Sequence, residues 1–293
     1  MKPRTSLFIL LTLAALISGA CVPVPAAAPA AAVPTETTVD VGNGIVGVLN
    51  QPAGATAGPA VLLLHGFGSS KDEVGNMYKN LAAALAEKGV SSLRIDFRGY
   101  GKSDGDTGAS TVDTMVEDAR TAYEYLKSLP SVDPERIGVL GFSLGGGVAM
   151  ISAGQHPDWY KSMATWSSVG DMATDMLGSV GQEAFDTAAA KGVVGLDLGW
   201  RTIVLKKEFF DSLARHDLAA LIQDYPGAFL AVAGDQDFSA AYAGDFVTAA
   251  KGDPKEAWII PGGDHIYGVL TEDQTMANRV IQKTADWFAE TLQ

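Results

Sequence analysis

The residue best suited to nucleophilic chemistry is Ser143, at the centre of the sequence Gly141-Phe-Ser-Leu-Gly145. An apolar run, 137–140, precedes this stretch, and a run of small and apolar residues, 146–153, follows it. A G-x-S-x-G pattern between a strand and a helix is typical of a sharp turn that strains its serine and exposes the hydroxyl above a sheet. The flanking glycines lack a Cβ atom, so the helix can begin close against the strand. The sequence therefore predicts that Ser143 is a nucleophile.

A serine hydroxyl is a weak nucleophile at neutral pH, so it needs a base. Histidine suits this role because its pKa lies near working pH. Of the four histidines, His265 lies in a glycine-rich loop, 261–268, which follows a predicted strand and precedes the last predicted helix. A side chain in such a loop can reach over the edge of a sheet, so we expect His265 to be the base. The other candidates are His65, His156 and His216.

The base needs an orienting acid, which we expect in the sequence Gly234-Asp-Gln-Asp237 after a predicted strand. Asp237 stands three residues past Gly234, which leaves room for a turn that directs its carboxylate inward. Asp235 is the competing candidate, although its position is better suited to capping that turn. Asp264 is a weaker alternative, because the side chains of adjacent residues such as Asp264 and His265 usually diverge.

A tetrahedral intermediate requires two backbone N–H donors. One is expected at Leu144, where the helix begins. The other is expected at Phe67, in the sequence His65-Gly-Phe-Gly68 after the first buried strand. His65 itself is interpreted as a structural hydrogen-bonding residue rather than as a second base.

Strands alternate with helices along the chain, which predicts a mostly parallel α/β sheet with helices on both faces. Ligands bind such sheets beyond the carboxyl ends of the strands, and the candidate residues follow strand ends. A Ser110-x-x-Asp113 pattern is expected to cap the helix predicted at 112–129. The predicted strands are 60–64, 90–96, 137–140, 163–167, 229–233 and 257–260, with a hairpin within 37–49; the predicted helices are 77–88, 112–129 and 274–291.

The segment Asp171–Tyr225 interrupts this alternation, with helical stretches and no clear strand. It is interpreted as a helical insertion, or lid, over the site, placed after the strand that follows the nucleophile helix. Its large apolar side chains either line an acyl or aryl pocket or only pack the insertion onto the domain. They are Met172, Met176, Trp200, Phe209, Phe210 and Tyr225.

The N-terminal residues are expected to lie outside the folded domain. Residues 1–20 combine a basic start, a short apolar core and small residues, which is typical of a signal peptide for export. Cys21, the one cysteine of the chain, follows as in a bacterial lipoprotein signal; ordinary signal-peptidase cleavage nearby is the alternative. Residues 21–36 are a Pro/Ala-rich linker, and the domain is expected at 37–293. The protein is therefore expected to be a cell-envelope lipoprotein tethered through lipidated Cys21, or secreted.

Five motifs carry a resemblance to the α/β-hydrolase superfamily over nearly all of residues 37–293: 65–68, 96–104, 141–145, 234–237 and 263–265. The chain most resembles the bacterial esterase and dienelactone-hydrolase-like branch, which includes feruloyl esterases and serine aminopeptidase-type members. The resemblance implies a catalytic triad of Ser143, Asp237 and His265, with an oxyanion hole at Phe67 and Leu144. Dienelactone hydrolases proper use a cysteine nucleophile, whereas this chain has Ser143.

The expected activity is that of a serine hydrolase, which cleaves small to medium carboxylic esters through an acyl-enzyme and needs no metal or cofactor. The alternative on the same triad is a peptidase or amidase of the serine aminopeptidase type, although 171–225 has no identifiable acidic cluster for an α-amino group. A binding protein on a hydrolase fold is a further alternative. Nucleic acid is not an expected partner, because the net charge is −13 and the basic residues do not cluster.

Overall fold

The computed structural model describes residues 33–293. The predicted signal peptide 1–20, Cys21 and the first part of the linker lie outside the described residues, so export and lipidation stay predictions. Thr35 and Glu36 already belong to the first strand, two residues before the expected start of the domain. Among residues 33–293, no helix has both the length and the apolar character needed to cross a membrane.

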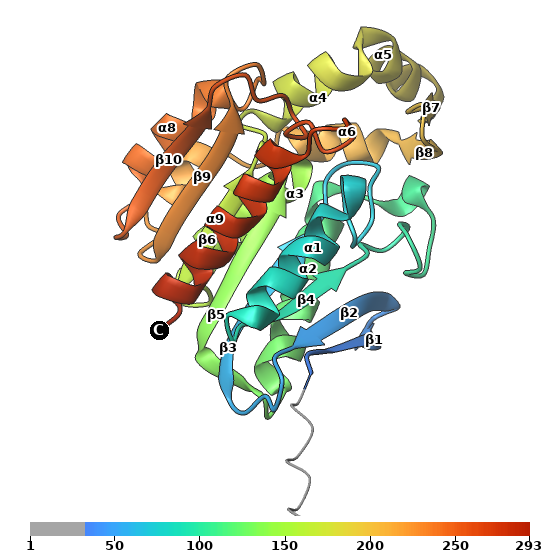
Figure 1. The fold of residues 1–293 in the computed structure, drawn as a ribbon. Coiled ribbons are helices and arrows are strands. Elements are labelled where there is room, and N and C mark those ends of the chain that lie inside the picture. The colour runs from blue at the N-terminus through green and yellow to red at the C-terminus, as the bar shows by residue number, and fades with distance from the viewer. Residues whose placement is uncertain (1–32) are drawn as a thin grey trace, which may run out of the picture. The chain divides into compact units, whose positions relative to one another are not determined.

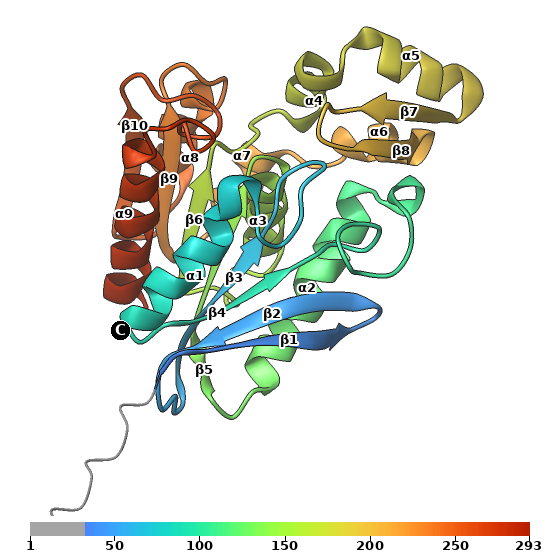
Figure 2. The same cartoon turned by 45° about the vertical axis from the view of Figure 1, so that its right-hand side comes forward.

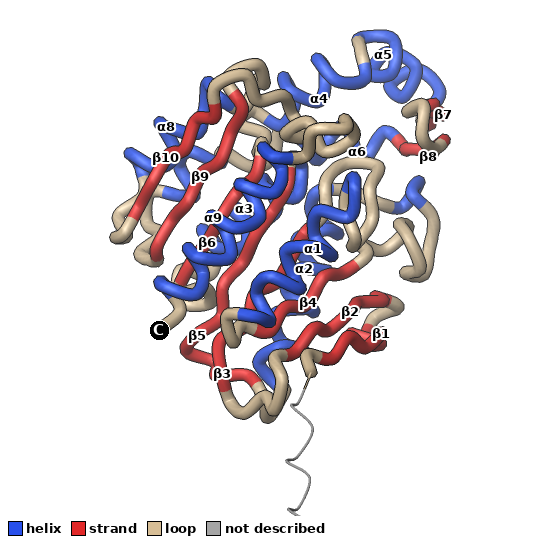
Figure 3. The backbone as a smooth tube through the Cα atoms, in the orientation of Figure 1, coloured by secondary structure: helices blue, strands red, loops and turns tan. Residues whose placement is uncertain are grey.

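An eight-stranded sheet forms the centre of the molecule, in the order β1-β2-β4-β3-β5-β6-β9-β10 (Figures 1 and 3). β1 and β2 form an antiparallel hairpin, β2 is antiparallel to β4, and the remaining neighbours are parallel, as predicted. The strands are β1 (Thr35–Gly42), β2 (Ile45–Gln51), β3 (Gly58–Leu64), β4 (Ser91–Ile95), β5 (Val132–Phe142), β6 (Ser162–Trp166), β9 (Ala228–Gly234) and β10 (Lys255–Ile260).

The central strands are apolar on both faces because helices cover both sides of the sheet. In β3, Val61 and Leu63 belong to one core cluster, while Leu62 and Leu64 belong to the other, as the two-residue period of a strand requires. Helices α1 and α9 cover the first face and lie side by side, while α2, α3 and α8 pack on the second (Figures 1 and 2). The helices are α1 (Met77–Glu87), α2 (Val112–Ser128), α3 (Leu144–Gln155), α8 (Ala240–Ala249) and α9 (Thr275–Thr291), with short 3-10 turns η1 (Val74–Asn76) and η2 (Thr107–Ala109).

The expected cap of helix α2 is wrong by one residue. Thr111, and not Ser110, is the N-cap, because its backbone is extended (φ −139°, ψ 167°) and its hydroxyl accepts from the N–H of Thr114 at 3.1 Å. The Thr114 hydroxyl accepts in return from the N–H of Thr111 at 2.9 Å. Threonine at both positions completes a reciprocal capping box, which satisfies two N–H groups that the helix leaves unpaired.

The elements of segment 171–225 from α4 to α6 lie beyond the carboxyl ends of the central strands, whereas α7 packs on α3 (Figure 2). The expectation that it holds no strand is wrong, because it contains an antiparallel hairpin, β7–β8. In β8, Ile203 and Leu205 are buried whereas Val204 is exposed, an alternation that suits a strand with one covered face. Its elements are α4 (Met172–Val180), α5 (Gln182–Lys191), β7 (Val193–Asp197), β8 (Thr202–Lys206), α6 (Lys207–Leu213) and α7 (Leu218–Ile222).

Candidate active site

Ser143 occupies the turn between β5 and α3 in a strained backbone conformation. Its φ of 52° and ψ of −119° are unfavourable for a residue with a side chain. The turn is held by the Ser143 N–H, which donates to the carbonyl of Trp166 at 2.9 Å, and by the Ser143 carbonyl, which accepts from Gly146 at 2.9 Å. Ser143 is half-buried although the residues on either side are buried. The turn therefore exposes the one residue that could act as a nucleophile.

Two glycines make this turn possible. A Cβ atom at Gly141 would lie 2.0 Å from the carbonyl oxygen of Gly145, and one at Gly145 would lie 2.2 Å from that of Leu64. Both obstacles are backbone atoms, which cannot rotate away as a flexible side chain could. The close approach of α3 to β3 and β5 therefore requires glycine at both positions, as the sequence pattern predicts.

Gly145→Ala is expected to destabilise the fold by several kcal/mol, because its Cβ would overlap backbone atoms of β3. The matched control is Gly178→Ala in helix α4, where a new Cβ meets nothing within 4 Å. This control should stabilise the protein by about 0.5–1 kcal/mol, since alanine lowers the entropy of the unfolded chain. Urea denaturation of both variants measures the two effects. Equal stabilities would contradict the steric role of Gly145.

The structure brings Asp237 and His265 together from the loops after β9 and β10. His265 Nδ1 lies 3.0 Å from Asp237 Oδ1, and the Asp237 side chain is only 4% exposed. The hydroxyl of Ser239 also donates to Asp237. Burial opposes ionisation of Asp237, but the hydrogen bonds from His265 and Ser239 and the charge of His265 outweigh it, so the pKa of Asp237 is lowered. Asp237 is therefore suited to orient a histidine and to stabilise its charged form.

The competing aspartates both cap turns. Asp235 Oδ1 accepts from the N–H of Gly262 at 2.7 Å, and this connects the loops after β9 and β10. Asp264 Oδ1 accepts from the N–H of Gly268 at 2.8 Å. Each carboxylate thus binds backbone donors of its own loops, and neither is found to contact His265.

Ser143 and His265 line one cavity of about 660 Å³. The ring of His265 packs between Phe142 and Phe238, with ring centroids 5.1 and 5.3 Å away, and its side chain stays 35% exposed. Two other histidines lie elsewhere: His156 stacks on Trp159, and His216 contacts Asp113. The cavity wall is mostly apolar and includes Phe67, Val74, Phe142, Val169, Met176, Trp200, Phe238, Ile266 and Leu270.

The apolar side chains of the 171–225 segment divide between wall and core. Met176 and Trp200 line the cavity, whereas Met172, Phe209, Phe210 and Tyr225 are buried in the core and do not line it. Trp200 is 71% exposed although it also lines the cavity, which places it at the entrance. The segment therefore supplies part of the cavity wall as well as packing.

The tip of hairpin β7–β8 contacts the loop that follows β3. Trp200 Nε1 donates to the carbonyl of Gly68 at 3.3 Å, and Arg201 donates to the carbonyls of Gly68 and Ser69 at 3.4 and 3.3 Å. The Arg201 guanidinium also lies 5.6 Å from the centre of the Tyr100 ring, at the range of a cation–π contact. Three hydrogen bonds thus hold the hairpin tip against this loop, and the cation–π contact holds it against the loop that follows β4.

The two expected oxyanion donors flank this cavity. Phe67 lines it, and Leu144 is the first residue of α3, directly after Ser143. Among the hydrogen bonds of residues 33–293, neither the N–H of Phe67 nor that of Leu144 has an acceptor. The N-terminus of α3 also carries the positive end of the helix dipole. The site therefore offers N–H groups suited to a developing oxyanion.

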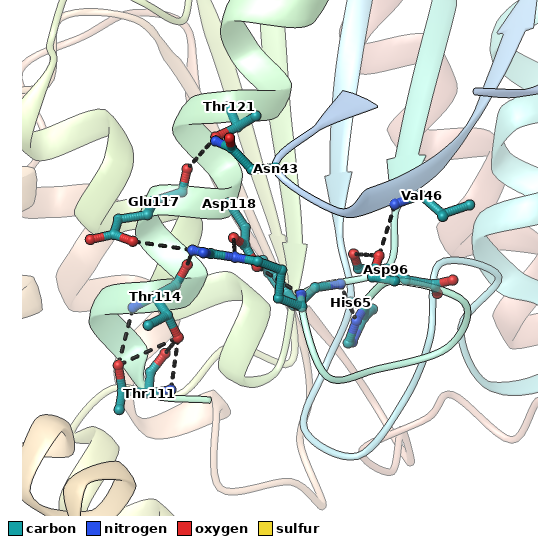
Figure 4. A network of polar contacts seen from close by, with 12 residues as sticks. Asn43, Val46, His65, Asp96, Thr111, Thr114, Glu117, Asp118 and Thr121 are labelled. Carbon is teal, nitrogen blue, oxygen red and sulfur yellow. Dashed lines mark hydrogen bonds and ion pairs between the residues drawn. The ribbon is translucent and has the colours of Figure 1, made fainter. Parts of the chain in front are cut away.

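His65 is a structural hydrogen-bonding residue, as interpreted from the sequence, and Figure 4 shows its ring in a network of polar contacts. Its Nδ1 lies 2.8 Å from the carbonyl of Gly66, and its Nε2 accepts from the N–H of Phe97 at 3.2 Å. One ring nitrogen donates and the other accepts, which is the pattern of an uncharged imidazole. Complete burial lowers the pKa of His65 to about 4, although the Gly66 hydrogen bond and the charge of Asp96 oppose the shift. His65 therefore joins the loops after β3 and β4.

This shift makes stability depend on pH. In the unfolded chain the pKa of His65 is near its ordinary value of about 6.5. The lowered pKa in the folded protein therefore stabilises the fold fully above that pH, and this stabilisation is lost as the pH falls towards 4. We expect about 2–3 kcal/mol of unfolding free energy to disappear between pH 7.5 and 4.5 through this group. In His65→Asn the unfolding free energy should fall less between these two pH values, by the same ~2–3 kcal/mol, as measured by urea denaturation at pH 7.5 and 4.5. An identical decrease in both proteins would contradict this role.

Three charged residues on the cavity wall were not identified from the sequence: Glu73, Asp175 and Arg201. Asp175 accepts from the N–H of Gly170 at 2.7 Å and from the hydroxyl of Tyr242 at 3.1 Å. Nothing in the local sequence separates these residues from ordinary surface charges, because their positions depend on contacts between distant loops. Within the described part of the chain, no group of three His, Cys, Asp or Glu side chains could hold a metal ion.

Solved structures with a similar fold include Est1E from Butyrivibrio proteoclasticus with bound ferulic acid, at a TM-score of 0.71 and 23% identity. The match covers 87% of this chain and 99% of that one. The esterase domain of a Rhodothermus marinus protein gives a TM-score of 0.65 at 24% identity and covers 89% and 99% of the two chains. Both similarities establish the fold.

Among curated relatives, an uncharacterized protein of Mycobacterium tuberculosis is 28% identical over 225 residues, which are 76% of this chain and 69% of that protein. A multifunctional-autoprocessing repeats-in-toxin protein of Vibrio vulnificus is 38% identical over 95 residues. These are 32% of this chain but only 2% of the toxin's length. The family described as serine aminopeptidase, S33, matches residues 56–202, which is half of the chain and includes the turn at Ser143. The protein is therefore a member of the serine aminopeptidase S33 family of α/β-hydrolases.

Proposed function

We propose that this protein is a serine hydrolase that cleaves carboxylic esters of small to medium size through an acyl-enzyme. One observation carries the proposal: a strained, half-buried Ser143 shares a cavity wall with a histidine that is hydrogen-bonded to a buried aspartate. Ser143 follows β5, His265 follows β10 and Asp237 follows β9. Loops at the same edge of the sheet therefore supply the proposed nucleophile, base and acid.

In the first half-reaction, Ser143 Oγ attacks the ester carbonyl and gives its proton to His265. Because Nδ1 of His265 faces Asp237, its Nε2 is the nitrogen available to accept this proton. Asp237 holds the ring in this orientation and stabilises the imidazolium. The imidazolium then protonates the leaving alcohol as the tetrahedral intermediate collapses to the acyl-enzyme.

In the second half-reaction, His265 removes a proton from water, which attacks the acyl-enzyme and releases the acid. The N–H groups of Phe67 and Leu144 stabilise the oxyanion in both steps. Their alignment before the reaction matters, because donors fixed in advance need no reorganisation in the transition state. No step requires a cofactor.

The shape and charge of the cavity support esters over peptides. Its wall is mostly apolar, which suits an acyl chain or ring. The aminopeptidase alternative needs a carboxylate free to bind an α-amino group. Both wall carboxylates are already engaged, since Asp175 accepts from two donors and Glu73 from three. The esterase domain of Rhodothermus marinus, similar in fold, gives further support to ester chemistry.

Hydrolysis of p-nitrophenyl esters from acetate to palmitate, beside a p-nitroanilide series, tests the proposal with the full chain. We expect ester turnover that depends on Ser143, and the chain-length optimum should reflect the 660 Å³ cavity. Preferential turnover of amino-acid anilides would instead support the aminopeptidase alternative. If no substrate in either series were turned over in a Ser143-dependent way, the proposal would be wrong for these substrate classes.

A further inference from the structure

A second buried carboxylate, Glu73, faces the cavity of the proposed active site, and the mechanism above gives it no role. Glu73 lies in the loop between β3 and α1 and is 8% exposed. It lines the same cavity as Ser143 and His265. A carboxylate is rarely buried without a reason, because removing its charge from water is costly.

Three donors, none of them charged, satisfy this carboxylate. Its Oε2 accepts from the N–H of Gly66 at 2.7 Å. Its Oε1 accepts from the hydroxyl of Ser69 at 2.5 Å and from the N–H of Val74 at 2.9 Å. Among the described residues, no Lys or Arg forms an ion pair with Glu73. Glu73 therefore bridges both ends of its loop with its negative charge left uncompensated by a neighbouring cation.

The backbone of Glu73 supports a specific role. Its φ of 60° and ψ of 171° lie in a region that glycine adopts easily and other residues avoid. Such a conformation persists only when the surroundings hold it. Here the hydrogen bonds of the side chain to Gly66 and Ser69 do so, and they direct the carboxylate back towards the start of the loop.

The bond to Gly66 matters because the next residue is Phe67, whose N–H is a proposed oxyanion donor. The bond from the Gly66 N–H fixes the peptide plane of His65 and Gly66. The next plane, which carries the Phe67 N–H, is held through the Gly66 carbonyl, which lies 2.8 Å from His65 Nδ1 and accepts from the N–H of Ser69 at 3.3 Å, and the Ser69 hydroxyl in turn donates to Glu73. We infer that Glu73 is a positioning residue, which fixes the oxyanion loop through Gly66 and Ser69 and places a negative charge in the cavity that also holds the imidazolium formed on His265. This inference rests on the proposed function, because it assumes that the Phe67 N–H binds an oxyanion.

The pKa of Glu73 is raised, because burial outweighs the hydrogen bonds from Ser69, Gly66 and Val74 and the charge of His265, which act in the opposite direction. The three donors still suit an ionised carboxylate, which only accepts hydrogen bonds. The pKa of the buried Tyr78 hydroxyl is also raised, mainly by burial and secondly by the charge of Glu73. Other charged or ionisable groups in this region are Arg201 on the hairpin tip, Asp175 on α4, Asp237, Asp264 and Tyr267 near His265, and the ion-paired Lys71–Asp96 and Asp72–Arg94.

Glu73→Gln and Glu73→Asp separate geometry from charge. Gln keeps the length but has one acceptor oxygen, so either Gly66 or the pair Ser69 and Val74 loses its acceptor. Asp keeps the charge but is too short to bridge both ends of the loop. Asp72→Asn is the control, because it neutralises the adjacent carboxylate, which pairs with Arg94 and does not line the cavity.

All variants are assayed with the p-nitrophenyl ester that the wild type cleaves best, in the full chain. Fluorophosphonate labelling, counted by mass spectrometry, normalises kcat to the fraction of folded sites. In Glu73→Gln and Glu73→Asp we expect kcat to fall about 10-fold or more with KM within about 2-fold, since loss of one oxyanion donor alone costs about 10²–10³. Glu73→Gln should lose more kcat than Glu73→Asp, because it also removes the negative charge that stabilises the imidazolium in the transition state. Asp72→Asn should match the wild type in both respects.

The outcomes distinguish this inference from the proposed function. If the wild type shows no Ser143-dependent turnover, the proposed function fails, and this inference with it. If the wild type is active and Glu73→Gln keeps kcat within about 3-fold, or loses activity only through KM, Glu73 has no positioning role and the proposed function stands. Equal losses of kcat in Glu73→Gln and Glu73→Asp would remove the electrostatic part of the inference.

Discussion

Replacing Ser143 with alanine is expected to lower kcat for ester hydrolysis by about four orders of magnitude or more while the fold stays intact. The loss is large because the proposed acyl-enzyme forms on Ser143 Oγ, and nucleophile deletions in serine hydrolases reach about 10⁶. Substrate binding should change little, since the cavity wall is mostly apolar and keeps its shape. Removing the hydroxyl leaves the strained backbone of the turn in place, because alanine meets the same conformational restrictions there.

Single-turnover and steady-state assays with the preferred p-nitrophenyl ester measure this effect. The matched control is Ser179→Ala in helix α4, which also faces the cavity and donates its hydroxyl to the carbonyl of Asp175. Its kcat should stay within about 3-fold of the wild type, because the Ser179 hydroxyl has no role in the proposed reaction. Substantial turnover by Ser143→Ala would show that the nucleophile lies elsewhere.

The second large effect is expected at Asp237, the proposed acid of the triad. Asp237→Asn should lower kcat by about 10⁴, as in serine proteases whose triad aspartate is replaced by asparagine. The amide N–H₂ of asparagine would face Nδ1 of His265, so the ring would adopt the tautomer that carries its proton on Nε2. In that tautomer Nε2 cannot accept the proton of Ser143. The 3.0 Å hydrogen bond between the two side chains would thus reverse its direction, which changes the protonation of the ring more than its position.

Asp235→Asn provides the comparison, because it makes the same change two residues away. The asparagine oxygen can still accept from the N–H of Gly262, so the turn survives and kcat should stay within about 3-fold. Thermal melting of both variants checks that the fold is unchanged. A larger loss in Asp235→Asn than in Asp237→Asn would move the acid to Asp235.

The parallel sheet was predictable because its strands are continuous apolar runs with helical segments between them. The candidate triad was placed by the same logic, since Asp237 and His265 follow strands and the carboxyl ends of parallel strands meet at one edge. The position of Ser143 was predictable from its two flanking glycines, because the absence of their Cβ atoms allows the close contact of α3 with the sheet.

Other features depend on contacts that the local sequence does not encode. The hairpin β7–β8 was missed because β7 contains Gly195 and has only partly buried residues on its inner face, which weakens its alternating pattern. Helix α8 was not predicted, because its run of alanines and glycine gives little helical periodicity. Glu73 was overlooked because its burial results from hydrogen bonds with residues four and seven positions earlier in an irregular loop.

The contacts of the hairpin tip with Gly68 and Ser69 have a consequence for how this protein can diversify. The loop of Phe67 is held on one side by Glu73 and on the other by Trp200 and Arg201. A segment that shapes the substrate pocket is thus also a support of the proposed oxyanion loop. Exchanging residues 171–225 for the corresponding segment of a relative would therefore alter turnover together with selectivity, unless the donors to these two carbonyls were kept. New specificities in this scaffold would accordingly arise more readily from substitutions along α4 than from a different hairpin tip.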